Sequence, residues 1–380
     1  MAATVRGIDR LKVLCVTPTG PDGKGGIDRL YYYMRQHMLE AGSSRDLDVH
    51  YFAARGAMEG WRSFVTFPFR ILAFVWVMLW YRIDVVHINH STHGSAIRKW
   101  ALGSLAKLMR RKVTTHFHGM ITPEDFAASP LWLKAFRSLC AQSDRIVVLG
   151  DVFITYFREK LGIDQEKLIV IPNGIPDFGM DCAIPRQSTG DKLILFAGEV
   201  GPRKGAGLLL EALAILRQKT PGWRCVMAGN GDIREYTAMM TMLGLKDRVS
   251  FTGWVSSDAV HELMRQADIV VLPSRVEALP LSLIEGACAG AALVASDAGA
   301  SAEVAREGRN GRIIPLESEG IADALAALLS RPGELARMQT ESRQLYLERF
   351  RIEQFETQWH DMLLSLDEKP VPSAAMVTAS

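Results

Sequence analysis

Two glutamates eight positions apart, Glu277 and Glu285, are the side chains of this sequence best placed to do chemistry. Glu277 stands in a short loop after the apolar run 268–272, and Glu285 stands in an amphipathic segment that begins after Pro280. This order predicts a strand, a loop and a helix N-terminus at the carboxyl edge of a parallel sheet, where open α/β sheets bind ligands. The free N–H groups of the helix suit a phosphate, and the carboxylates suit the hydroxyl groups of a sugar because they accept strong hydrogen bonds.

The spacing and setting of these glutamates resemble the E-x7-E motif of the retaining nucleotide-sugar glycosyltransferases of family 4. The resemblance runs from near residue 11 to near residue 366 of the 380-residue chain. It implies that Glu277 binds hydroxyl groups of a donor sugar and that Glu285 binds the ribose hydroxyl groups of the nucleotide. It also places Ala278 and Leu279 among the donor-binding residues.

A glycine-rich segment follows the first apolar run, 11–17, and opens a predicted helix. Gly25 and Gly26 resemble the family's Gly-Gly loop at the donor, where the absence of a Cβ lets the backbone approach a ligand. The segment is not a dinucleotide fingerprint, because Asp28 replaces the last required glycine, and no Ser or Thr follows its lysine as in a P-loop. Further along, His118 stands where the family places an active-site histidine beside the donor sugar.

The second half of the chain begins again with an apolar run, a glycine loop and a predicted helix, in residues 192–213. Lys204 matches the family's lysine that binds the donor diphosphate. Glu199 stands where the family usually has an arginine. Arg203 is then either a replacement for that charge, because a guanidinium binds phosphate through two hydrogen bonds, or an exposed surface side chain.

The length of 380 residues predicts two domains, and the resemblance implies an α/β GT-B architecture of two Rossmann-like domains facing a cleft. We expect an acceptor-binding domain in residues 1–180, a donor-binding domain in 181–350, a closing helix in 351–366 that packs back on the first domain, and a disordered tail in 369–380. Asn173 ends the first domain, and we predict that it serves as a turn residue with left-handed geometry rather than as a ligand contact.

The composition narrows the class of protein and the cellular compartment in which we expect it. Hydrophobic residues make up 48% and charged residues 23%, as in an ordinary globular enzyme. A net charge of +2 implies no strong field for nucleic acid, so no nucleic-acid partner is expected. The five cysteines form no metal or redox spacing and are predicted to be buried thiols in a reducing compartment. Because no signal peptide is recognisable, we expect a cytoplasmic protein.

Two groups of residues contain side chains that can bind a metal ion. Five histidines cluster between His87 and His118, and Asp46-Leu47-Asp48 is a literal D-x-D. The histidine spacing fits no familiar zinc pattern, and strand alternation points neighbouring side chains to different faces. The D-x-D precedes a strand far from the donor motifs. We therefore predict no metal site and no cofactor.

The run of eleven apolar residues 71–81 has two interpretations. As a helix it spans about 16 Å, whereas a bilayer core needs about 30 Å, so it does not cross a membrane. It is either a buried helix packed on the sheet or, with the aromatic and arginine side chains of 61–82, a surface for an anionic membrane. The second interpretation predicts peripheral attachment at the inner face of the cytoplasmic membrane.

The resemblance implies a retaining transfer of a hexosyl group from a nucleotide-diphosphate sugar to a glycan or polyprenyl-linked acceptor, in bacterial cell-surface or exopolysaccharide biosynthesis. Lys204 and the helix after Pro280 would stabilise the leaving diphosphate without a metal. His118 and Glu277 would complete the catalytic group by holding the sugar. Two alternatives stay open: another sugar-phosphate enzyme of the same cleft architecture, such as a phosphorylase or epimerase, or an inactive scaffold, which the departure at Glu199 favours.

Overall fold

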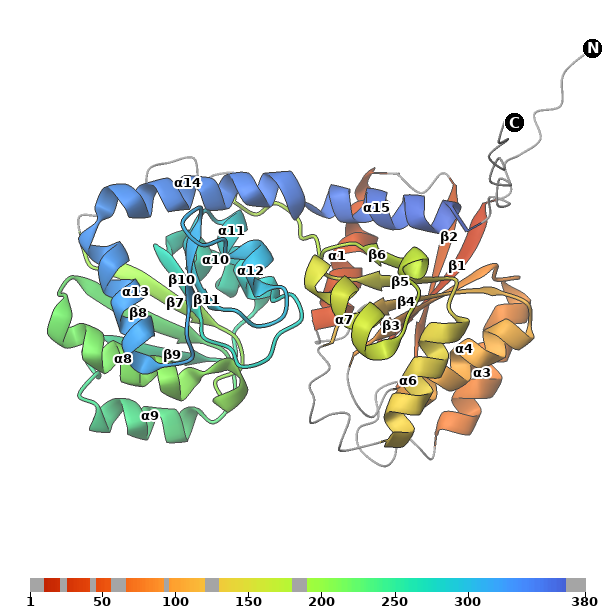
Figure 1. Ribbon diagram of the computed structural model, residues 1–380, viewed down its shortest axis with the longest axis horizontal. Helices are drawn as coiled ribbons and strands as arrows, with labels where there is room; N and C mark the ends of the chain where they lie inside the picture. Colours follow the sequence, from red (N-terminus) through yellow and green to blue (C-terminus); the bar gives the residue numbers. More distant parts are fainter. Residues whose placement is uncertain are drawn as a thin grey trace, which may run out of the picture.

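The computed structural model describes residues 10–20, 26–41, 46–55, 66–91, 96–119, 130–179 and 190–366. The chain forms two α/β domains that lie side by side along the long axis of the molecule (Figure 1). Each domain contains a six-stranded sheet. The prediction of an α/β protein with two doubly wound domains is confirmed.

The first sheet has the strand order β2-β1-β3-β4-β5-β6, and all its strands are parallel. Its strands are β1 (Leu11–Thr17), β2 (Leu47–Ala53), β3 (Val85–His90), β4 (Lys112–Phe117), β5 (Arg145–Val148) and β6 (Leu168–Val170). The helices of this domain are α1 (Gly26–Ala41), α3 (Phe67–Trp80), α4 (Ala96–Leu108), α6 (Pro130–Gln142), α7 (Asp151–Leu161) and the short 3-10 helix η2 (Gln165–Lys167).

The second sheet has the order β12-β11-β10-β7-β8-β9 and is also parallel. Its strands are β7 (Lys192–Ala197), β8 (Trp223–Ala228), β9 (Val249–Gly253), β10 (Ile269–Leu272), β11 (Ala292–Ser296) and β12 (Gly311–Ile314). The helices are η4 (Pro202–Lys204), α8 (Ala206–Lys219), α9 (Ile233–Met242), α10 (Ser257–Gln266), α11 (Leu281–Cys288), α12 (Ser301–Val304), α13 (Ser318–Ser330) and α14 (Pro332–Arg349), followed by α15 (Ile352–Leu364).

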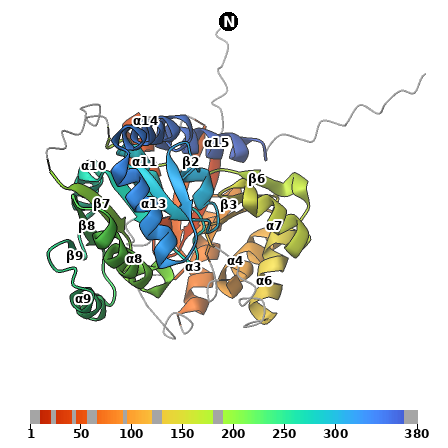
Figure 2. The same ribbon diagram turned by 60° about the vertical axis from the view of Figure 1, so that its left-hand side comes forward.

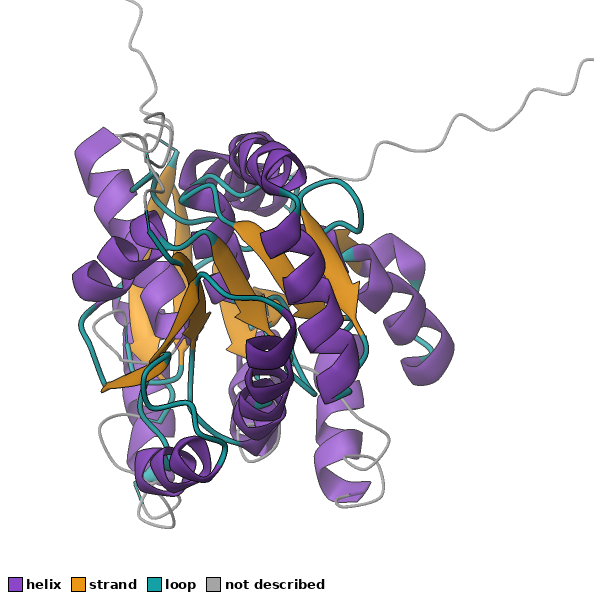
Figure 3. Ribbon diagram, turned by 90° about the vertical axis from the view of Figure 1, so that its left-hand side faces the viewer, coloured by secondary structure: helices purple, strands orange, loops and turns teal. Residues whose placement is uncertain are grey.

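Both sheets are covered by helices on their two faces, which is why their strands read as continuous apolar runs (Figure 3). Strands β3 and β10 are buried along their whole length. In each sheet the strand order reverses once, between β1 and β3 in the first and between β7 and β10 in the second. Crevices outside the carboxyl ends of strands at such reversals are where doubly wound folds bind ligands.

Helices α14 and α15 run consecutively over the two domains, α14 over the second and α15 over the first (Figures 1 and 2). Phe355 and Trp359 of α15 pack into the core of the first domain with Val13 and Tyr31. The chain crosses between the domains a second time beside this point, where Ile175 pairs with the backbone on both sides of Arg351. The two crossings therefore lie next to each other, in the arrangement of a hinge.

Helix α3 is buried on one side only. Phe74 and Met78 are fully buried and pack against the first sheet, with the ring of Phe74 5.4 Å from that of Phe52. The opposite side exposes large apolar residues to solvent: Phe69, Leu72, Trp76, Leu79 and Trp80 are 57–72% exposed. The interpretation of 71–81 as a buried helix thus holds for one face, because only one side of a helix can meet the sheet.

None of the helices in the described residues is long and apolar enough to cross a membrane. The predicted tail, 369–380, and Gly25 lie outside the described residues, as does the whole stretch 61–65 that precedes α3. Four cysteines of the described part are buried free thiols, as predicted.

Candidate functional site

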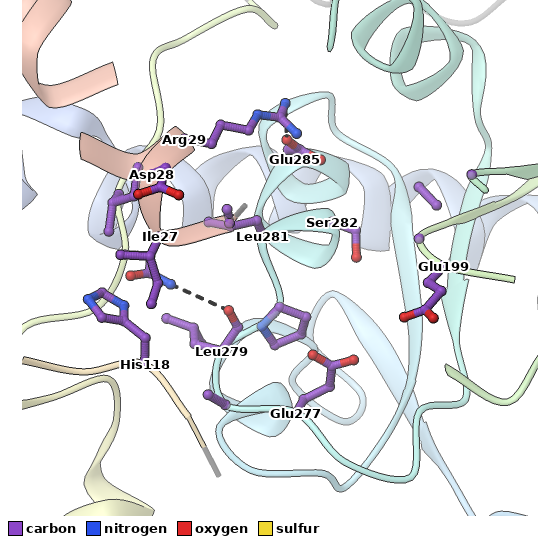
Figure 4. Close-up of a pocket in the computed structure, with 18 of the residues that line it drawn as sticks. Ile27, Asp28, Arg29, His118, Glu199, Glu277, Leu279, Leu281, Ser282 and Glu285 are labelled. Atoms are coloured by element: carbon purple, nitrogen blue, oxygen red, sulfur yellow. Dashed lines mark hydrogen bonds and ion pairs between the residues drawn. The ribbon is translucent and has the colours of Figure 1, made fainter. Parts of the chain in front are cut away.

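A cavity of about 1220 Å³ lies between the domains. Its walls come mainly from loops and helix starts that follow strands of the two sheets, including those at the two reversals of strand order (Figure 4). Residues predicted from the sequence that line it are Gly26, His118, Arg203, Lys204, Glu277, Ala278, Leu279 and Glu285, and Glu199 lines it as well. The described members of the predicted site therefore meet in one cavity.

Lys204 and Glu277 form a close ion pair, with Nζ 2.5 Å from Oε1 and both side chains at least 87% buried. The pair joins the loop after β7 to the loop after β10. Gly205 makes this contact possible: its φ is +75°, and a Cβ there would overlap the carbonyl oxygen of Pro273. A lysine and a carboxylate thus stand together at the carboxyl edge of the sheet, beside the start of α11.

Arg203 lies on the rim of the same group. Its side chain is 52% exposed, and its guanidinium lies 3.2 Å from Glu199 and 4.0 Å from Glu277. Arg203 therefore lines the cavity and is held by the glutamate that replaces the family's arginine. Because it is half exposed, solvent screens its charge more than that of Lys204.

Glu285 is buried in α11 and forms an ion pair with Arg29, whose Nη2 lies 2.7 Å from Oε1 (Figure 4). Arg29 belongs to α1 of the first domain and also contacts Tyr33 and His261. The pair bridges the two domains. Arg29 is not among the residues predicted from the sequence, although its position in the first turn of the helix after the glycine loop is a signal for a site residue.

His118 follows β4 and faces the cavity (Figure 4). Its Nε2 lies 2.8 Å from Oδ1 of Asn89, whose amide nitrogen donates to Val16. Burial lowers the pKa of His118 well below its usual value, and the charges of His87 and Lys99 lower it further. The ring is therefore neutral, with its proton on Nε2, and Nδ1 is left as an acceptor for a hydroxyl group.

Asn173 differs from its prediction. It is not among the residues with positive φ, and its side chain donates to the carbonyl oxygen of Leu279 at 3.4 Å, across the cavity that it lines. The left-handed turn predicted for Asn173 is wrong. The side chain instead ties the end of the first domain to the donor loop.

Of the two groups considered for metal, the histidine cluster contributes His118 to the cavity, and the D-x-D lies at the start of β2. His87 bonds Tyr31 and Thr114 in the core of the first domain. Asp48 lies 3.3 Å from His50 in β2 and is half exposed. No cluster of three potential metal ligands occurs among the residues that the structure describes.

Two family models match the chain in succession. Residues 24–177 match the model "Glycosyltransferase Family 4", and residues 183–345 match "Glycosyl transferases group 1". The boundary between the matches falls between the two sheets. Each domain of the fold is therefore matched by a glycosyltransferase model of its own.

Among curated proteins, the chain is 31% identical over 259 residues to phosphatidyl-myo-inositol mannosyltransferase of Mycobacterium tuberculosis, covering 65% of this chain and 64% of that one. It is 31% identical over 179 residues to an uncharacterized glycosyltransferase of Methanocaldococcus jannaschii, covering 44% and 46%. The chain thus spans less than two thirds of the length of these relatives.

Among solved structures, Anabaena HepE in complex with UDP and glucose superposes with a TM-score of 0.73 at 20% identity, over 94% of this chain and all of that one. A sucrose-phosphate synthase of Thermosynechococcus elongatus gives a TM-score of 0.75 at 17% identity, over 94% and 99%. At these identities the superpositions establish the fold. With the two family models, they show that this chain belongs to the glycosyltransferases of the family 4 type and has the GT-B fold.

Proposed function

We propose that the protein transfers a hexosyl group, with retention of configuration, from a nucleotide-diphosphate sugar to a glycan or lipid-linked acceptor. The observation that carries the proposal is the buried pair Lys204–Glu277 at the cavity between the domains. A lysine beside a helix start provides positive charge for a diphosphate, and the adjacent carboxylate accepts hydrogen bonds from sugar hydroxyl groups.

In this proposal the diphosphate is the leaving group. Lys204 and the first N–H groups of α11 stabilise the negative charge that develops on it when the bond to the sugar breaks. Glu277 holds hydroxyl groups of the sugar, and neutral His118 accepts a further hydrogen bond through Nδ1. Glu285 binds the ribose, sharing its carboxylate with Arg29. The acceptor attacks the donor sugar on the same face from which the diphosphate leaves.

The printed names of similar proteins support this choice. One relative is a mannosyltransferase, and one structure of the same fold holds UDP and glucose. The alternatives are another sugar-phosphate enzyme of the same architecture and an inactive scaffold, which the glutamate at position 199 favours. The intact Lys204–Glu277 pair argues against the scaffold, because a fold without activity has no need to keep two buried charges together.

A thermal-shift series with UDP-, GDP- and ADP-sugars tests the proposal. One nucleotide family should stabilise the protein, by about 2.7 kcal/mol when the ligand is at 100 times its dissociation constant. The sugar that gives the largest shift identifies the donor. If no member of the series raises the melting temperature, the donor assignment is contradicted.

Arg203→Ala should reduce kcat/KM less than tenfold, because its guanidinium is half exposed and screened. Steady-state kinetics with the stabilising donor measures the loss. Glu199→Ala is the matched control, since it removes the partner of Arg203 without removing the positive charge. A loss as large as that of a Lys204 variant would show that Arg203 takes over the role of the family's arginine.

We also propose that transfer needs no metal ion, because Lys204 and the start of α11 supply the positive charge. Treatment with EDTA should leave the transfer rate unchanged within about twofold. The preorganised cationic site stabilises the charge of the leaving diphosphate, which a divalent ion stabilises in metal-dependent enzymes. The rate is measured before and after chelation and again with added Mg²⁺. Loss of activity on chelation with recovery by Mg²⁺ would contradict this assignment.

We propose that the acceptor is reached at the inner face of the cytoplasmic membrane, with α3 resting on an anionic bilayer. The outer side of α3 presents a row of aromatic and aliphatic residues, in which Trp76 and Trp80 stack at 5.4 Å. Arg70 and Arg82 flank this row. Tryptophan with nearby arginine suits the interface of an anionic membrane, and the buried free thiols are consistent with a reducing compartment.

Sedimentation with anionic liposomes should carry the protein down at low salt and release much of it at high salt, because the arginine contribution is screened. The variant Leu72→Ser/Trp76→Ser/Trp80→Ser should remain in the supernatant. Met242→Ser, a change of an 82% exposed apolar residue in the second domain, is the control. If the wild-type protein stays in the supernatant at low salt, α3 does not bind membranes.

A further inference from the structure

Helix α7 of the first domain begins without a cap of its own. Its N-cap residue is Gly150, which has no side chain to accept from the first backbone N–H groups of the helix. The acceptor comes from the second domain, because Oε1 of Glu303 in α12 lies 2.7 Å from the backbone nitrogen of Asp151. The two helices lie on the sides of the domains that face each other (Figure 1). A carboxylate of one domain therefore caps a helix of the other.

The close approach of these helices depends on the glycine at position 150. A Cβ added there would overlap Oε1 of Glu303 and would lie 2.7 Å from the Cβ of Ala300, the residue that precedes α12. The backbone of Gly150 is extended, with a φ of −172°, so its own conformation would accept any residue. It is the contact between the domains that requires glycine at this position.

The segment that carries Glu303 also supports the loop that carries the donor residues. The backbone N–H of Ala300 donates to the carbonyl oxygen of Ala278 at 2.8 Å. Ala278 follows Glu277, and both line the cavity. Helix α12 has only four residues, so Glu303 stands three positions after the residue that bonds the donor loop. A shift of α12 would therefore move the loop that holds Glu277.

Glu303 is also bonded to the place where the chain crosses between the domains. Its second oxygen, Oε2, lies 3.2 Å from Nη2 of Arg349, the last residue of α14. Two positions later, the backbone on both sides of Arg351 pairs with Ile175. The side chain of Glu303 is 19% exposed, so solvent screens these contacts only in part. One carboxylate thus joins the start of α7, the support of the donor loop and the crossing.

We propose that Glu303 is a positioning residue for transfer, which fixes the donor loop relative to the first domain. Glu303 is not among the described residues that line the cavity of about 1220 Å³, so it acts through the residues that it holds. The sugar would be held by His118 of the first domain and Glu277 of the second, so its alignment depends on how the domains meet. The role in transfer rests on the proposed function, whereas the tie between the domains does not.

Glu303→Ala should lower kcat about tenfold and leave the affinity for free nucleotide unchanged, because the donor loop loses its alignment while Glu285 and Lys204 keep their own contacts. Glu303→Gln should recover most of the rate, since its amide oxygen can still accept from the N–H of Asp151. Glu319→Ala, which changes an exposed glutamate in the first turn of α13, is the control. A wild-type kcat in Glu303→Ala would overturn the proposal.

Gly150→Ser tests the same contact from the first domain. The serine hydroxyl would cap α7 within its own domain, so the melting temperature should be kept. The new Cβ would overlap Glu303 and Ala300, so the contact must open and kcat should fall as in Glu303→Ala. Gly333→Ser is the matched control, because a Cβ at this glycine, also at a helix start, would meet open space. Full activity of Gly150→Ser would show that transfer does not need the contact, which overturns the positioning role.

Hydrogen exchange of the ligand-free protein, followed by mass spectrometry, tests the tie without any donor. Glu303→Ala should speed exchange both at the start of α7 and in residues 277–281, because α12 holds both segments. This result, in a protein that binds no nucleotide sugar, would support the tie and count against the proposed function alone. An increase confined to the start of α7 would mean that Glu303 only caps a helix, and the positioning role would be refuted.

Discussion

Lys204→Met should lower the rate of sugar transfer about 100-fold or more, because removing one preorganised group that stabilises the transition state costs about 3 kcal/mol. The Lys204 side chain is 13% exposed and its ammonium is held against Glu277, so its charge acts in a site with little water. The measurement is kcat with saturating donor, compared with that of Lys134→Met, which changes an exposed lysine of α6. A variant with full activity would contradict the role of Lys204 at the diphosphate.

The same substitution removes the nearest cation from the buried Glu277 carboxylate and leaves it the half-exposed Arg203 at 4.0 Å, which should also lower the stability of the second domain. The double variant Lys204→Met/Glu277→Gln separates the two effects. It removes the unpaired charge, so the melting temperature should recover while activity stays lost. If activity recovered together with stability, the rate loss in the single variant would reflect unfolding and not catalysis.

Glu285→Gln should weaken binding of the free nucleotide and of the nucleotide sugar alike, by about tenfold, because a charged hydrogen bond to the ribose is lost. Glu277→Gln should leave free-nucleotide affinity unchanged and reduce sugar transfer. Isothermal titration of both variants with nucleotide and with nucleotide sugar measures the difference. Equal losses of free-nucleotide affinity in the two variants would show that the roles are wrongly assigned.

The ion pair between Glu285 and Arg29 requires its own control, since Glu285→Gln breaks a contact between the domains as well as a ligand contact. Arg29→Met breaks the same pair but keeps the carboxylate. If Glu285 binds the ribose, nucleotide affinity falls in Glu285→Gln and not in Arg29→Met. A similar fall in both variants would attribute the effect to domain closure.

Local sequence patterns were sufficient for the sheets and for the loops that carry the donor residues. Strands such as β10 are short, buried on both faces and followed by turn residues, so their places could be read along the chain. The glycine at 205 marked the turn that brings Lys204 toward Glu277. The family resemblance placed both side chains at the donor, but their ion pair was not predicted.

Features that depend on contacts between distant segments could not be predicted. The bond from Arg29 to Glu285 joins residues of different domains, and the burial of Lys99 depends on how α4 packs. Asn173 was assigned to a turn because its type favours turns, whereas its side chain reaches the donor loop. The outer side of α3 was also ambiguous, since a helix that is apolar all round does not reveal which side meets the sheet.

The most direct test of the central claim follows donor cleavage by NMR in the absence of acceptor, using α-linked UDP-, GDP- and ADP-sugars. The proposal predicts that water replaces the acceptor slowly with one donor, releasing the nucleoside diphosphate and a sugar that first appears as the α-anomer. Lys204→Met should abolish this reaction. First appearance of the β-anomer would contradict retention, and release of a sugar phosphate with a nucleoside monophosphate would contradict glycosyl transfer.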